Sequence, residues 1–181
     1  MKEKKLPDLI ASSAMMRYLP SFAGVKSRKM RIGRKASIMT NHIFLSMPGA
    51  FASSVESGEG DASHLVDGSP RTYWHTMYSV TVANYPHWFD LDCGSAKILK
   101  GFTYLPRQDS PNGRIKNYRV QVSEDGKSWS KAVAEGNFEN GMKQQRVLFG
   151  KPVKARYLRF TALSSQDGQD FATCAEFTVL Q

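Results

Sequence analysis

The sequence predicts an all-β sandwich, and three observations support this fold class. From residue 52 onward, short apolar or alternating runs recur between turn signals. No stretch carries the sustained periodicity of a long helix. With 181 residues, of which 41% are hydrophobic, the chain is long enough to bury one core. We therefore expect one folded domain over residues 51–181, preceded by a basic segment over residues 1–50.

The positive charge of the chain is concentrated in the first 50 residues. They hold ten lysines and arginines against two acidic residues, which accounts for +8 of the formal net charge of +9. The run from Lys26 to Lys35 is too highly charged to pack into a core, so we predict that this segment is mobile. The remaining residues are close to neutral, and we therefore expect no nucleic-acid partner for the folded domain.

Residues 36–52 permit two interpretations. A basic flank, an apolar centre and the small residues of Ala50-Phe51-Ala52 follow the order of a secretory signal or anchor. The interruption of the apolar run at Thr40 to His42, together with the long basic region, favours a linker or the remnant of an upstream domain. No run reaches the roughly 18 apolar residues that a membrane-spanning helix needs.

The first loop of the folded part, from Val66 to His75, has a defined turn chemistry. The Asp67 side chain can bond its own backbone, Gly68 tolerates positive φ, and Pro70 presets the following residue. A carboxylate at Asp67 and a hydroxyl at Thr72 are oxygen ligands of the type that Ca²⁺ collects from short loops. The loop is therefore a candidate cation site.

Turn signals rich in glycine, proline, asparagine and aspartate separate the predicted strands, which cover residues 87–92, 98–105, 118–123, 146–149, 156–162 and 176–180. In the third of these, Tyr118, Val120 and Val122 alternate with Arg119 and Gln121. Successive side chains of a strand point to opposite faces, so this pattern predicts one buried and one exposed face.

Two cysteines and several aromatic residues lie in the predicted strand regions. Cys93 and Cys174 are too few for a disulfide framework and lack the spacing of a zinc site, which favours buried free thiols; a single bridge is the alternative. Aromatic residues at strand positions usually pack inward. We therefore expect four of them in the core, namely Trp74, Trp88, Tyr104 and Trp129.

Six motifs in a fixed order connect this chain to a known family. They lie at residues 66–75, 87–94, 101–107, 118–129, 155–160 and 175–177. In this order and spacing the chain resembles the coagulation factor V/VIII type C (discoidin) superfamily, most closely its carbohydrate-binding branch, carbohydrate-binding module family 32. The resemblance covers about residues 50–181 and implies a jelly-roll β-sandwich of the galactose-binding-domain type.

The resemblance also implies a sugar-binding site on loops at one end of the sandwich. It assigns to this site the histidine of a Trp-His pair, the arginine of a Pro-Arg pair, an upstream acid and a late-loop aromatic, which are His75, Arg107, Glu59 and Phe171. Asn112 and Tyr78 are further candidates. The alternatives are a structural role for His75, pairing of Arg107 with Asp109, and packing of Phe171 onto the core.

A structural Ca²⁺ is the second implication of the resemblance. Its ligands would be the side chains of Asp67, Thr72 and Glu176 and the backbone carbonyls of His64, Ser69 and Ala175. Oxygen-only ligands suit this ion. The alternative is a turn without metal, in which a buried Glu176 pairs with an arginine or with the backbone.

Catalytic motifs with recognisable spacing, such as GxSxG, HExxH and the phosphate-binding glycine loop, are absent from the sequence. This absence, together with the resemblance to a binding module, implies a non-catalytic domain. The resemblance further implies a module that recognises terminal galactose-type sugars of glycans, and we expect it to be a monomer. Such modules usually accompany a glycoside hydrolase catalytic domain, which implies an extracellular, periplasmic or cell-surface location.

The competing interpretation is a discoidin-type domain that binds a phospholipid membrane or a protein partner. The apolar residues of one loop, Met77, Tyr78, Val80 and Val82, are the candidates for membrane contact. The polar loop over residues 108–113 argues against this reading.

Overall fold

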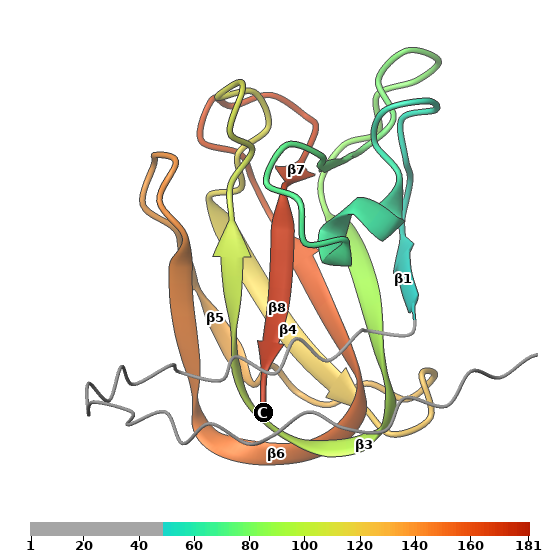
Figure 1. The fold of residues 1–181 in the computed structure, drawn as a ribbon, viewed down its shortest axis with the longest axis vertical. Helices are drawn as coiled ribbons and strands as arrows, with labels where there is room; N and C mark the ends of the chain where they lie inside the picture. Colours follow the sequence, from blue (N-terminus) through green and yellow to red (C-terminus); the bar gives the residue numbers. More distant parts are fainter. Residues whose placement is uncertain (1–48) are drawn as a thin grey trace, which may run out of the picture. The chain divides into compact units, whose positions relative to one another are not determined.

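The fold was obtained as a computed structural model that describes residues 49–181, and this part is nearly all strand (Figure 1). The predicted mobile segment over residues 1–50, and the choice between signal and linker, lie outside the described residues except for Gly49 and Ala50. Within residues 49–181, no helix is both long enough and apolar enough to cross a membrane.

One short 3₁₀ helix and eight strands make up the described part of the chain. In order they are β1 (Gly49–Ala52), η1 (Ala62–Val66), β2 (Trp74–His75), β3 (His87–Leu105), β4 (Asn117–Ser123), β5 (Ala134–Asn137), β6 (Gln145–Ala162), β7 (Thr173–Cys174) and β8 (Glu176–Leu180). This composition confirms the predicted all-β class.

The strand predictions differ from the structure mainly in continuity. The predicted strands 87–92 and 98–105 are two halves of β3, and 146–149 and 156–162 are the ends of β6. The pairing of β3 with β6 shifts register twice, between Asp92 and Lys97 and between Leu99 and Gly101. Such bulges bend a strand without ending it. Polar and glycine residues at a bend look like a loop in sequence, which is why two strands were expected.

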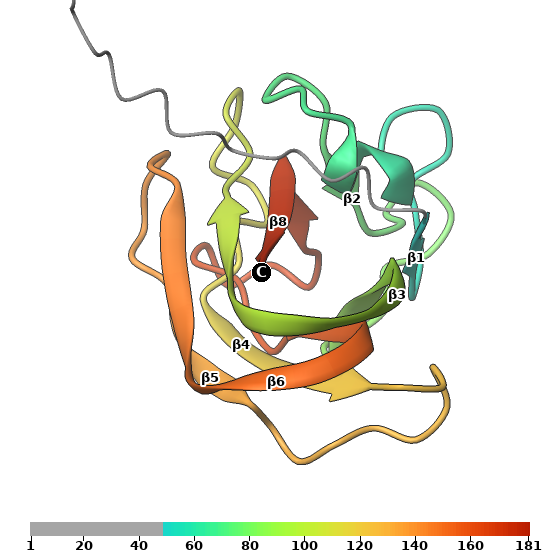
Figure 2. The ribbon, with the colours of Figure 1, turned by 60° about the horizontal axis from the view of Figure 1, so that its bottom comes forward.

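Bending turns one sheet into two facing layers (Figure 2). The strand order is β1-β3-β6-β4-β5, with β8 pairing on β3, and all of these neighbours are antiparallel. The first half of β3 pairs with β1 and with the end of β6, while its second half pairs with β8 and the start of β6. The result is the expected jelly-roll sandwich.

Strand β1 belongs to the folded domain. Ala50 pairs with Leu91 and Ala52 with Phe89, and both alanines pack against the core. The strand begins at Gly49, two residues before the predicted domain start. Cleavage after Ala52 would remove this strand from the sheet.

Stacked aromatic side chains fill the space between the layers. The ring centroids of Phe102 and Phe177 lie 4.9 Å apart, and those of Phe89 and Phe160 lie 5.0 Å apart. Each such pair contributes about 0.5–1.5 kcal/mol beyond the burial of its area. The expected core positions of Trp74 and Tyr104 are confirmed, since both are fully buried.

The expectation that Trp88 and Trp129 lie in the core is wrong. Both are half-buried, and each ring stacks on the guanidinium of Arg159 at 4.3 Å. Arg159 also makes two 2.7 Å hydrogen bonds to the Asp90 carboxylate. Trp88 alternates with the buried Phe89 and therefore points to the outer face of the sheet, where a cation replaces the core as its packing partner.

Cys93 and Cys174 are both buried and unbridged, as the free-thiol interpretation predicted. Burial raises the pKa of each thiol, because the low-dielectric interior disfavours the thiolate. Neither sulfur is therefore activated as a nucleophile.

Candidate functional site

One end of the sandwich gathers the loops that carry most of the predicted site residues (Figure 1). The end of β3, the short β2-β7 pair and the loops at residues 53–61, 76–86, 106–114 and 163–172 meet there. The chain end at Gln181 lies toward the opposite end of the sandwich. A rigid scaffold that presents polar loops at one end is the usual arrangement of a binding site.

His75 lies in β2 and is almost fully buried. Its Nδ1 is 2.6 Å from the carbonyl oxygen of Thr76, and since a carbonyl only accepts, Nδ1 must carry the proton. Burial lowers the pKa of His75 and so favours the neutral ring. Nε2 is thereby left as a hydrogen-bond acceptor.

Aromatic rings surround the His75 imidazole. The ring centroid of Tyr78 lies 4.8 Å away and that of Phe171 lies 5.2 Å away, on loops nearly a hundred residues apart in sequence. Tyr78 is exposed and Phe171 is half-buried, so both can present a face to a ligand. Phe171 therefore does not fold back entirely onto the core.

Arg107 follows Pro106 directly after β3, and its side chain is held on two sides. Its Nε and Nη2 donate to the Asp109 carboxylate at 2.7 and 3.0 Å, and its guanidinium carbon lies 3.9 Å from the centroid of the Tyr73 ring. The Asp109 carboxylate raises the pKa of Arg107. Pairing with Asp109 is the alternative predicted from the sequence. It leaves the N–H groups of Nη1 available for a ligand.

Glu59 joins the site through Tyr78, whose hydroxyl donates to Glu59 Oε1 at 2.8 Å. This hydrogen bond is also the largest cause that raises the pKa of Tyr78. The next residue, Gly60, packs directly on the backbone of His75, where an added Cβ would lie 2.7 Å from the His75 carbonyl oxygen. Only glycine allows this approach, which fixes the Glu59 loop against His75.

Asn112 is exposed at the rim of the site. Its carbonyl accepts a hydrogen bond from the hydroxyl of Thr173 at 2.9 Å, and its side chain points to no partner within residues 49–181. The following Gly113 has φ +66° and packs on the Phe171 ring, 2.9 Å from an added Cβ. Asn112 thus stays near Phe171 through the backbone.

Three residues that the sequence reasoning did not select support the site. Tyr73 lies beneath Arg107, and Arg114 binds the Arg107 carbonyl. Glu56 is buried and accepts hydrogen bonds from the backbone N–H groups of Tyr78 and Ser79, at 2.7 and 3.0 Å. The contacts of Tyr73 and Glu56 join loops that are distant in sequence, and the contact of Arg114 depends on how the loop over residues 106–114 folds. Neither kind of contact leaves a local pattern in the sequence.

The residues expected to bind a cation form a cluster of oxygen atoms beside η1. The Asp67 carboxylate accepts from the Ser69 N–H at 2.8 Å and from the Thr72 hydroxyl at 2.7 Å, and the Ser69 carbonyl lies 3.1 Å from that hydroxyl. His64 lies in η1, where its ring bonds the Tyr73 carbonyl. The predicted hydrogen bond between the Asp67 side chain and the backbone of its own turn is therefore confirmed.

Glu176, at the start of β8, completes this cluster. Burial and the neighbouring Asp67 carboxylate raise the pKa of Glu176 to about 8, and its Oε1 is buried without a hydrogen-bond partner among residues 49–181. Ala175, just before it, donates its N–H to the Leu105 carbonyl at 2.9 Å. Two adjacent carboxylates with an unsatisfied buried oxygen fit a hard cation. Of the metal-free alternative, no ion pair of Glu176 with an arginine occurs among residues 49–181, whereas the backbone N–H groups of Gly68 and Ser69 lie close enough to lower the pKa of its carboxyl.

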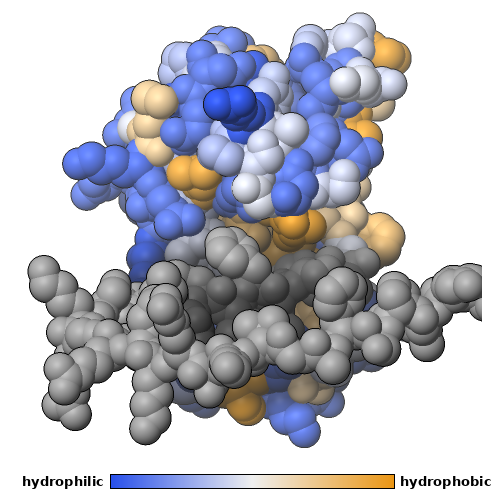
Figure 3. Space-filling view, viewed as in Figure 1, coloured by the Kyte–Doolittle hydropathy of each residue, from blue (hydrophilic) through white to orange (hydrophobic). Residues whose placement is uncertain are grey.

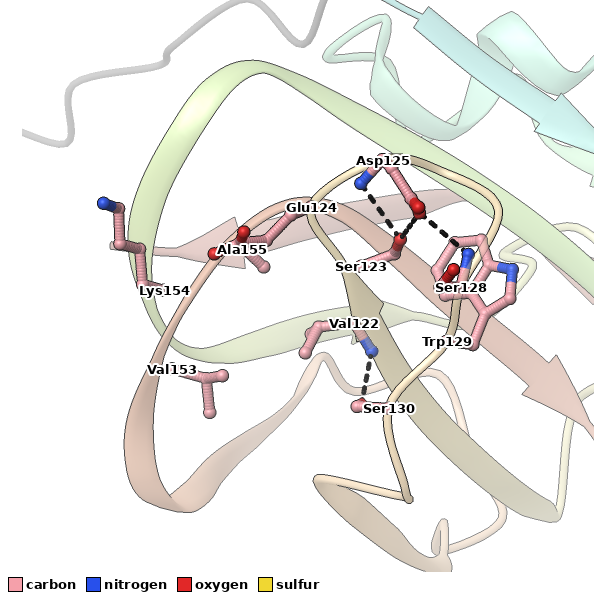
Figure 4. Close-up of a pocket in the computed structure, with 10 residues that line it drawn as sticks. All are labelled: Val122, Ser123, Glu124, Asp125, Ser128, Trp129, Ser130, Val153, Lys154 and Ala155. Carbon is pink, nitrogen blue, oxygen red and sulfur yellow. Dashed lines mark hydrogen bonds between the residues drawn. The ribbon is translucent and has the colours of Figure 1, made fainter.

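A hollow of about 560 Å³ opens at a different place, where β4 ends beside the bend of β6 (Figure 4). Its polar groups are largely engaged with one another. The Asp125 carboxylate accepts from the Ser123 hydroxyl and from the N–H groups of Lys127 and Ser128, each at 2.8 Å. None of the predicted site residues lines this hollow, and we do not assign the site to it.

The fold and the loops define a class of protein: a jelly-roll domain that presents a polar and aromatic site at one end. The sequence matches the F5/8 type C domain family over residues 50–177. This chain belongs to that family, and its fold is that of family 32 carbohydrate-binding modules.

Solved structures support the same assignment. A family 32 module from Clostridium perfringens, in complex with GalNAc-β-1,3-galactose, is 34% identical with a TM-score of 0.68, over 74% of this chain and 94% of that one. The family 32 module of NanJ from the same organism, in complex with galactose, is 30% identical with a TM-score of 0.65, over 72% and 91% of the two chains.

Among curated proteins, a sialidase from Micromonospora viridifaciens is 40% identical over 67% of this chain and 19% of its own length. A galactose oxidase from Gibberella zeae is 33% identical over 71% of this chain and likewise 19% of its own length. The chain thus spans about a fifth of these relatives.

Proposed function

We propose that this domain binds terminal galactose-type residues of glycans, galactose or N-acetylgalactosamine, without catalysing a reaction. The observation that carries the proposal is the grouping of a neutral His75, a fixed Arg107 and the rings of Tyr78 and Phe171 at one end of the sandwich. Similar modules are described in complex with galactose and with a GalNAc-galactose disaccharide.

The chemistry of these groups suits a sugar hydroxyl. A hydroxyl donates one hydrogen bond and accepts others, so it can donate to His75 Nε2 and accept from Arg107 Nη1. The C–H face of a sugar ring packs on an aromatic surface, which Phe171 and Tyr78 offer. Glu59 and Asn112 would bind further hydroxyls of the ligand.

A structural Ca²⁺ is part of the proposal. Asp67, Thr72 and Glu176 would bind it with their side chains, and His64, Ser69 and Ala175 with their carbonyls. The unsatisfied Glu176 Oε1 beside Asp67 supports this assignment. The ion would supply charge that compensates the two carboxylates, and so order the loop that leads to His75.

The location and the partner are proposed from the relatives. The curated relatives are much longer than this chain, which supports attachment to, or cooperation with, a catalytic domain such as a glycoside hydrolase. Binding to the glycan would raise the effective concentration of that catalytic domain at its substrate. We propose an extracellular, periplasmic or cell-surface setting and a monomeric module.

Calorimetric titration of the full chain with galactose, N-acetylgalactosamine and lactose, in the presence of calcium, tests the proposal. We expect weak binding with Kd on the order of 0.1–1 mM, or about 4–5.5 kcal/mol. His75→Ala and Arg107→Ala should each abolish the heat while the fold is retained. Arg119→Ala, at an exposed ion pair on β4, is the matched control and should bind normally.

One observation favours a second candidate, binding to a phospholipid membrane. Val80 and Val82, in the loop that projects beside the site, are 84% and 48% exposed. The face shown in Figure 3 is mainly hydrophilic at the loop end, with apolar atoms at the upper right, where this loop projects. If no sugar produces heat and the chain binds anionic vesicles, the ligand is a membrane and not a glycan.

A further inference from the structure

Tyr73 contacts the one cationic side chain of the proposed sugar site. Its ring centroid lies 3.9 Å from the guanidinium carbon of Arg107, within the range of a cation–π contact. The ring is half-buried and lies 6.4 Å from the His75 ring, centroid to centroid. Tyr73 therefore lies next to both polar groups proposed to bind the ligand.

The contact restricts how Arg107 can be oriented. Asp109 holds two nitrogens on one edge of the guanidinium, and Tyr73 covers one of its faces. Asp109 alone leaves the plane of the guanidinium free to tilt about that edge. The ring of Tyr73 removes this freedom, so the remaining N–H groups at Nη1 keep one direction.

Tyr73 is itself attached to rigid parts of the fold. Its carbonyl accepts a hydrogen bond from His64 Nδ1 at 3.1 Å, and the next residue, Trp74, is fully buried. The Trp74 indole donates to the Ser54 carbonyl at 3.0 Å. The ring beneath Arg107 is thus fixed to η1 on one side and to the core on the other.

We propose that Tyr73 is a positioning residue of the sugar site, which acts on the ligand through the orientation of Arg107. The inference rests on the proposed function, because the effect on affinity requires that Arg107 binds the sugar. The aromatic ring of Tyr73, and not its hydroxyl, makes the contact that orients Arg107. Orienting a group in advance raises affinity because the ligand does not have to order it.

The structure contains a matched control at the far end of the sandwich. There the Tyr157 ring lies 4.9 Å from the guanidinium carbon of Arg156, and Asp92 holds Arg156 with two 2.8 Å hydrogen bonds. This trio repeats the chemistry of Tyr73, Arg107 and Asp109 away from the site loops. Tyr157→Leu therefore removes the same kind of contact without touching the proposed sugar site.

The test compares Tyr73→Phe, Tyr73→Leu and Tyr157→Leu in the full chain, with galactose as the titrant. We expect Tyr73→Phe to bind within about twofold of the wild type and Tyr73→Leu to bind about 5- to 20-fold more weakly. Tyr157→Leu should bind like the wild type. Wild-type affinity in a folded Tyr73→Leu would overturn the inference, as would equal losses in both leucine variants.

A measurement without sugar separates this inference from the proposed function. NMR relaxation of the side-chain Nε–H of Arg107 reports the order of the guanidinium. We expect Tyr73→Leu to lower that order and Tyr73→Phe to preserve it, and unchanged order in Tyr73→Leu would contradict the inference. If Tyr73→Leu does not fold, Tyr73→Met takes its place in both measurements. If the wild type binds no sugar, the proposed function fails, and the positioning of Arg107 is decided by NMR alone.

Discussion

The guanidinium of Arg114 donates two hydrogen bonds, from Nε and Nη2, to the backbone carbonyl of Arg107 at 3.1 and 3.0 Å. Arg114 is buried, and a charged group rarely lies inside a protein without such partners. The pair fixes the backbone of the very residue whose side chain faces the proposed ligand. It joins the two ends of the loop over residues 106–114.

Arg114→Met should weaken both the fold and the site. Loss of the two donors leaves a part-buried carbonyl unsatisfied, and we expect the free energy of unfolding to fall by about 1–3 kcal/mol. Chemical denaturation measures this change, and galactose titration should show weaker binding in the same variant. Arg119→Met, at an exposed ion pair, is expected to change stability by less than about 0.5 kcal/mol. Equal effects of the two substitutions would contradict the prediction.

Sugar binding should decrease at acidic pH because of His75. Burial lowers the pKa of this ring below its ordinary value of 6.5, so the neutral ring is present at neutral pH. As the pH falls through this lowered pKa, Nε2 gains a proton and can no longer accept from the ligand. Since the unfolded chain binds that proton more readily, the stability that His75 contributes is also lost as the pH falls.

Titration with lactose between pH 8 and pH 5 tests this pH dependence. Affinity should be constant at the alkaline end and decline at the acid end. An affinity that rises toward pH 5 would show that the charged ring binds the ligand. Thermal unfolding measured at the same pH values separates weaker binding from loss of the fold.

Removal of calcium should destabilise the domain through Glu176. At saturation about 100-fold above its Kd, a ligand stabilises the folded state by about 2.7 kcal/mol, so chelation should lower Tm by roughly 5–10 °C. Glu176→Gln removes one of the two adjacent carboxylates, and its Tm should not respond to chelation. Glu139→Gln, at an exposed acid elsewhere, should retain the full response. A wild-type Tm that is indifferent to chelation would refute the metal assignment.

Arg159→Ala should reduce stability without changing sugar affinity. The substitution removes the cation between Trp88 and Trp129 and leaves Asp90 without its partner, with an expected loss of about 1–3 kcal/mol. Arg159 lies on the outer face of the sheet and not among the loops of the site. Denaturation and galactose titration of the same variant measure the two effects, and a loss of affinity in a folded variant would contradict this separation.

The outline of the fold follows from local sequence patterns. The alternation of Tyr118, Val120 and Val122 predicts β4 and its buried face, and the predicted strand over residues 176–180 coincides with β8. The continuity of β3 and β6 was not predictable in the same way. A bulge carries the same polar and glycine residues as a loop, and only its pairing with a neighbouring strand shows that the strand continues.

The candidate site was likewise predictable only in part. The strand and turn patterns of the sequence predict the all-β class, and the resemblance to the family implies His75 and Arg107, the histidine of a Trp-His pair and the arginine of a Pro-Arg pair. What surrounds these two residues follows from the tertiary structure, which brings Phe171 beside His75, Tyr73 beneath Arg107, and Arg114 to the carbonyl of Arg107. The first two contacts join loops that are distant in sequence, and the third lies within the loop over residues 106–114. The geometry of these contacts is set by the bending and packing of the sheet. Local residue patterns do not predict the distances between these side chains.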